Sequence, residues 1–121
     1  MKTLGIILLL CLSTIGYGQT EFWKAYAMNF GFQKTDSVEW VGAKDVDILI
    51  EAYEDKLVIN SNKHQVYRRV ATLSKNENIT TWEMVDNEGE HCRMAITYLG
   101  GDDLMVMIKY EIAVWYYICK F

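Results

Sequence analysis

The residues that could do chemistry are few and widely spaced. His64 and His91 are the only histidines, and no cysteine or acidic residue lies at the spacing from them that a zinc site requires. The chain also lacks the motifs of serine hydrolases, zinc peptidases and phosphate-binding loops. We therefore expect a protein that is not an enzyme and that has no catalytic residue, cofactor or metal.

An acidic cluster is the other candidate site. Glu83, Asp86, Glu88 and Glu90 surround a predicted turn, and carboxylate oxygens are ligands that calcium prefers. The spacing of an EF-hand loop is absent, so we interpret the cluster as a solvated turn.

The central stretch, residues 46–61, predicts a β-hairpin. Its apolar residues alternate with polar ones, which places successive side chains on opposite faces of a strand. A loop at Glu54 and Asp55 would pair Ala52 with Leu57 and Ile50 with Ile59, so that apolar residues meet across the strands.

A second hairpin is predicted over residues 79–98. A three-residue turn ending at Gly89 would allow the positive φ that such a turn needs. It would also place apolar residues opposite each other, in the pairs Met84 with Cys92, Trp82 with Met94, and Thr80 with Ile96.

The residues that follow position 20 fit both the spacing of a helix and the alternation of a strand. Phe22, Tyr26 and Phe30 are spaced as on a helix, whereas the aromatic density and Gly31 favour a strand. We predict a strand over residues 25–34 with a helical turn before it, a short strand over 38–41 and another strand over 64–73.

The last hairpin, residues 103–120, is apolar on both faces. One face carries Leu104, Val106 and Ile108, and whether it joins Met94 and Ile96 depends on the length of the loop at residues 99–102. A strand pair with two apolar faces lies between layers or at an interface. We therefore predict an apolar binding face at Met105, Met107, Val114, Tyr116 and Ile118.

About nine short strands and the absence of a convincing long helix indicate an all-β fold. The hairpins predict an antiparallel meander, either a small barrel or, alternatively, a β-sandwich. Closure into a barrel would remove unprotected strand edges.

The N-terminal residues predict export. Lys2, the apolar run over residues 4–15 and the small residues Gly16 and Gly18 are typical of a signal peptide that covers residues 1–18. Residues 19–121 would then form a single domain, either periplasmic or secreted, with no membrane span after signal removal. The predicted strand positions of Cys92 and Cys119 lie at opposite ends of the sheet, so we expect free, buried thiols.

The chain is acidic overall, with 16 acidic and 12 basic residues. No basic run is present, which argues against a nucleic-acid partner.

From Trp40 onward, the layout resembles a group of small exported proteins of Bacteroides-type bacteria, largely uncharacterised as a group. The resemblance rests on Trp40, residues 47–50, Gln65 with Tyr67, Asp86 with Gly89, and residues 115–117. It implies no activity. The hairpin-rich plan is also loosely similar to calycin barrels, at the level of fold only.

We therefore predict a non-catalytic binding module for a small apolar ligand or a protein partner. The alternative is an inhibitor of an exported or cell-wall hydrolase, which would insert a loop such as residues 60–63 or 74–78.

Overall fold

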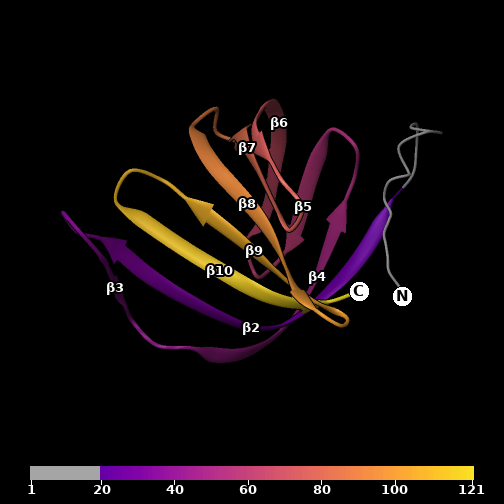
Figure 1. The fold of residues 1–121 in the computed structure, drawn as a ribbon, viewed down its shortest axis with the longest axis horizontal. Coiled ribbons are helices and arrows are strands. Elements are labelled where there is room, and N and C mark those ends of the chain that lie inside the picture. The colour runs from indigo at the N-terminus through magenta and orange to yellow at the C-terminus, as the bar shows by residue number, and fades with distance from the viewer. Residues whose placement is uncertain (1–19) are drawn as a thin grey trace.

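The computed structural model describes residues 20–121, which form nine strands (Figure 1). The predicted signal peptide, residues 1–18, lies outside the described residues. Within residues 20–121 no helix has the length and hydropathy needed to cross a membrane. The strands are β2 (Glu21–Gln33), β3 (Val38–Trp40), β4 (Lys44–Ala52), β5 (Lys56–Asn60), β6 (His64–Lys75), β7 (Ile79–Val85), β8 (His91–Gly100), β9 (Asp103–Lys109) and β10 (Ala113–Lys120).

Eight of these strands form a closed antiparallel barrel. Neighbours in the sheet follow chain order from β4 to β10, and β10 then pairs with β2 to close the ring. β3 is an additional strand that pairs only with β2. The all-β prediction is confirmed in its barrel form, and the architecture is consistent with a calycin-like barrel.

The predicted hairpin registers are confirmed. In the central hairpin Ile50 lies opposite Ile59 and Ala52 lies opposite Leu57. In the second hairpin Trp82 pairs with Met94, and Gly89 has the positive φ, 85°, that its turn requires. Both registers follow from the period of two, because a shift of one residue would turn every apolar side chain to the opposite face.

The prediction of a helical turn before residue 25 is wrong. β2 is extended from Glu21 onward, because its first half pairs with β4 and places Trp23 opposite Ile50. Strand pairing therefore overrides the helical spacing of the aromatic residues. The chain accommodates the curvature of the barrel with a bulge between Ala25 and Ala27.

The pairing of β9 with β8 determines which face of β9 joins the core. A bulge between Tyr98 and Gly100 sets the register, so that Met94 lies opposite Ile108 and Ile96 lies opposite Val106. Leu104, Val106 and Ile108 therefore point into the barrel, whereas Met105 and Met107 belong to the outer face.

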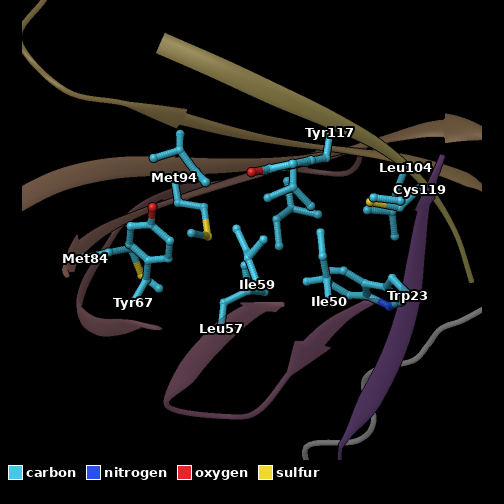
Figure 2. Close-up of a cluster of buried hydrophobic side chains, with 14 of the residues drawn as sticks. Trp23, Ile50, Leu57, Ile59, Tyr67, Met84, Met94, Leu104, Tyr117 and Cys119 are labelled. Carbon is cyan, nitrogen blue, oxygen red and sulfur yellow. The ribbon is translucent and has the colours of Figure 1, made fainter. Parts of the chain in front are cut away.

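Inward side chains from all eight barrel strands pack against one another in the middle of the barrel. Figure 2 shows these side chains converging from opposite walls. Trp23 and Ile50 contribute from one side, and Met94 and Tyr117 from the other. A large apolar side chain buried in this way contributes roughly 1.5–3 kcal/mol. Most inward residues in the middle of the barrel therefore stabilise the fold by packing in its core.

Both cysteines within residues 20–121 are free and buried, as predicted. Cys92 is the second residue of β8, near one end of the barrel, and Cys119 is the last but one of β10, near the other end. Burial raises the pKa of Cys92 to about 11 and the pKa of Cys119 to about 12. Both thiols therefore stay protonated and unreactive at neutral pH.

Candidate binding surface

One part of the molecule extends beyond the barrel, and we call residues 28–41 and 110–116 the arm. It comprises the second half of β2, all of β3, the start of β10 and the turn before β10 (Figure 1). The backbone N–H of Gln33 donates to the carbonyl of Ile112 over 2.9 Å, so the pairing of β2 with β10 continues to the end of the arm. β4, which pairs with the first half of β2, does not extend this far.

The inner face of the arm is a row of aromatic rings. Tyr110 stacks on Trp115 with ring centroids 5.6 Å apart, and Trp115 stacks on Phe30 at 5.9 Å. Phe32 then meets Phe30 edge to face at 5.2 Å. The row begins at the barrel core and ends at Phe32, which is 44% exposed. Contacts of this kind hold the rings in fixed positions.

A shallow open groove of about 600 Å³ lies at the outer end of this row. It is lined by Phe32, Lys34, Glu39, Trp40 and Val41. The Lys34 ammonium and the Glu39 carboxylate form an ion pair of 3.3 Å within this lining, and both side chains are largely exposed. The lining thus combines apolar and charged side chains, and the groove is open to solvent.

The tip of the arm also exposes apolar residues that a turn does not need. Val41 is 68% exposed and Ile112 is 69% exposed. Together with Phe32 and Trp40 they gather four of the large exposed apolar side chains of the described residues at one end of the molecule. Such a cluster marks an interaction site more often than single exposed apolar residues do.

The outer face of the arm is packed instead of open. A Cβ atom at Gly31 would lie 2.7 Å from Val38 Cγ1 and 2.8 Å from Trp40 Cε3, so these two side chains of β3 pack over the glycine. The Trp40 ring then reaches Tyr116 at 5.1 Å. Val114, which lies opposite Gly31 in the register, is consequently only 2% exposed.

The predicted apolar face therefore divides into a covered part and an open part. Val114 is buried and Tyr116 lies against Trp40, whereas Met105, Met107 and Ile118 are half-buried on the outer wall. The structure brings all five together on neighbouring strands, since Met107 pairs with Tyr116 and Met105 pairs with Ile118. Binding at this face stays a prediction.

Asp86 ties the base of the arm to the rest of the barrel. Its carboxylate accepts a hydrogen bond of 2.6 Å from the Tyr110 hydroxyl and further bonds of 2.9 Å from the backbone N–H groups of Glu88 and Glu90. Partial burial acts to raise the pKa of Asp86, but these hydrogen bonds outweigh it and lower the pKa below its ordinary value. Burial and the bond to Asp86 raise the pKa of Tyr110.

The two histidines and the acidic cluster do not form a common site. His91 Nδ1 lies 2.6 Å from Glu83 Oε2 on the outer surface, whereas His64 begins β6. In residues 20–121 no group of three or more histidine, cysteine or acidic side chains is arranged to hold a metal ion. Asp86 uses its carboxylate on its own turn and on Tyr110.

Comparison with family models, with curated proteins and with solved structures gives no match for this chain. The geometry of the arm is therefore the basis for inferring a function.

Sequence reasoning missed Phe32, Val41 and Ile112 as site residues. Phe32 shares its face with Phe30, so it is indistinguishable from a core residue by spacing. The available signal was apolar residues at turns, since Val41 precedes Gly42 and Ile112 follows Glu111. Turns favour Gly, Asn, Asp and Ser, so these positions were unusual.

Proposed function

We propose that this protein is a non-catalytic binding module whose binding surface is the inner face and tip of the arm. The observation that carries the proposal is the cluster of exposed apolar side chains at the end of the aromatic row, which comprises Phe32, Trp40, Val41 and Ile112. Inward residues in the middle of the barrel pack against one another, which favours a ligand at the exposed arm over one held deep inside.

The groove can meet an apolar group of a ligand or protein partner beside polar ones. Phe32 and Val41 offer apolar contact, and Lys34 with Glu39 can meet polar groups at the rim. The aromatic side chains lose little conformational entropy on binding, because the neighbouring rings already hold them.

Titration with the apolar dye 8-anilinonaphthalene-1-sulfonate tests this proposal. We expect saturable dye fluorescence that Phe32→Ser and Val41→Ser each weaken about tenfold, close to the loss of one large apolar contact. Leu73→Ser on β6 is the matched control, because Leu73 is also 44% exposed but lies outside the arm. Equal loss in the control and the arm variants, or no dye binding by the folded protein, would overturn the proposal.

The inhibitor alternative needs one inserting loop. The loops at residues 60–63 and 74–78 flank opposite ends of β6, so they lie at opposite ends of the barrel and cannot enter one cleft together. No contact in the structure favours either loop.

We also propose that the protein acts outside the cytoplasm, in the periplasm or as a secreted protein, and that it belongs with the small exported proteins of Bacteroides-type bacteria. The leader-like residues 1–18 support export, and the landmarks from Trp40 onward support the relationship.

A further inference from the structure

The arm ends in a free strand edge. Of the nine strands in the described residues, β3 alone has a strand neighbour on only one side. β5 pairs with β4 only from Leu49 to Ala52, so Lys44–Ile48 also has β2 as its only strand neighbour. Residues 38–48 therefore present one long edge that no described strand covers.

The connection between β3 and β4 does not break this edge away from the sheet. The Val41 N–H donates to the Phe30 carbonyl at 2.7 Å, and the Gly42 N–H donates to Asn29 Oδ1 at 2.9 Å. The chain thus stays beside β2, with one extra residue between Trp40 and Lys44 where Gly42 has a φ of 140°. At about 3.3 Å per residue, residues 38–48 offer room for a partner strand of ordinary length.

The hydrogen-bond pattern shows which backbone groups are free. In an antiparallel pair, alternate residues bond to the neighbouring strand. Because Val41 bonds to Phe30, Glu39 is the other residue of β3 that faces β2. The backbone groups of Val38 and Trp40 consequently point toward the uncovered edge.

We propose that this edge binds an extended peptide segment of a protein partner by strand addition, with one large apolar side chain in the groove beside Phe32. This inference rests on the proposed function and specifies its partner. Strand addition combines main-chain hydrogen bonds with pockets for alternate side chains, and the edge and groove supply both. The groove lining includes Glu39, Trp40 and Val41, so a side chain of the added strand would reach it directly.

The charge of residues 38–48 indicates what other residues the partner peptide should carry. Residues 38–48 carry three acids and one base. Lys34 pairs with Glu39 and Lys24 pairs with Asp47, which leaves Asp45 without an ion-pair partner within residues 20–121. A basic residue in the partner segment would complement it. A second copy of this chain fits poorly, because antiparallel pairing of residues 38–48 with themselves would place Glu39 opposite Asp47.

The test starts from dodecapeptides selected by phage display against the full chain, with the best binder made synthetically. We expect the bound peptide to protect the Val38 and Trp40 amides from hydrogen exchange. N-methylation of alternate peptide amides should weaken binding about tenfold or more, and N-methylation of the intervening amides should have little effect.

A pair of variants isolates the backbone contribution. Val38→Pro removes the N–H at the uncovered edge, and Val38→Ala removes the same side chain but keeps the N–H. We expect Val38→Pro alone to weaken the peptide about tenfold, with melting curves confirming that both variants fold.

Three outcomes would overturn strand addition. They are a peptide insensitive to N-methylation, the absence of any selected peptide, and self-association of the chain that protects the same amides. In each case, dye binding that still depends on Phe32 would leave the proposed function standing. Loss of dye binding as well as strand addition would overturn the two proposals together.

Discussion

The two halves of β2 carry similar aromatic side chains on the same face, but these side chains are buried in the first half and exposed in the second. In the first half, Trp23 is only 6% exposed, because β4 and the far wall of the barrel cover it. In the second half, Phe32 reaches the same face because the bulge between Ala25 and Ala27 shifts the alternation by one residue. It is 44% exposed, because the arm has no opposite wall. Alternation together with the bulge thus decides which face a side chain takes, and closure of the sheet decides whether that face is buried.

The two halves of β2 also have separate roles, one in the stability of the fold and one in the proposed binding. Residues in the closed half contribute to the core, and residues in the open half are free to meet a ligand. Sites placed on a rigid scaffold but outside its core can change without loss of the fold. The variants below test this separation within one molecule.

The largest expected effect is on the closed half of β2. We expect Trp23→Ala to lower the free energy of unfolding by about 3–5 kcal/mol, because it leaves a large cavity in the core. Phe32→Ala should cost less than about 1 kcal/mol, because its ring is already partly in water. Urea unfolding measures both, and equal losses would show that the arm is as much a part of the core as the barrel.

Gly31 is expected to give the next largest effect. Gly31→Ala places a methyl group against Val38 and Trp40, and overpacking of this kind costs about 1–3 kcal/mol. Combining it with Trp40→Ala should recover part of that loss, because one of the two clashing side chains is gone. Additive losses in thermal unfolding would mean that β3 does not lie over Gly31 as described.

Asp86 gives a smaller, pH-dependent effect. The lowered pKa means that its contribution to stability is fully present above the ordinary carboxyl pKa and is lost as the pH falls through the lowered value. At neutral pH, Asp86→Asn should cost about 1–2 kcal/mol through the weakened bonds to Tyr110 and the turn. Its unfolding free energy should also fall less than that of the parent protein between neutral and acidic pH. Parallel pH profiles would contradict the assignment.

The smallest effect concerns the thiols. With pKa values raised to about 11 and about 12, Cys92 and Cys119 should not react with Ellman's reagent in the native protein at pH 8. Both should react once urea unfolds the barrel. Reaction of Cys92 alone in native buffer would indicate that the base of the arm opens separately from the barrel.

The sequence was enough to predict the hairpins and not enough to predict the arm. The pairs Ile50–Ile59 and Trp82–Met94 followed from local alternation across short turns. Closure between β10 and β2 joins segments far apart in the chain, and no local pattern encodes it. The aromatic residues of β2 also fitted a helical spacing until their pairing with β4 was known.

The candidate face on β9 and β10 was predicted from its surplus of apolar residues. Its outward position follows from the register, but its partial cover by Trp40 depends on that side chain packing over Gly31. That contact joins residues with no relation in sequence spacing. The groove beside Phe32 arises in the same way, from β2 and β3 meeting beyond the barrel.

Closure of the ring by β2 and β10 has a consequence for how the molecule is made. Asn29 and Tyr116, which are hydrogen-bonded across this seam, are 87 positions apart in the chain. The backbone hydrogen bonds between β2 and β10 can therefore form only after the final strand has been synthesised. Long-range pairing of this kind slows folding and leaves nascent chains prone to associate.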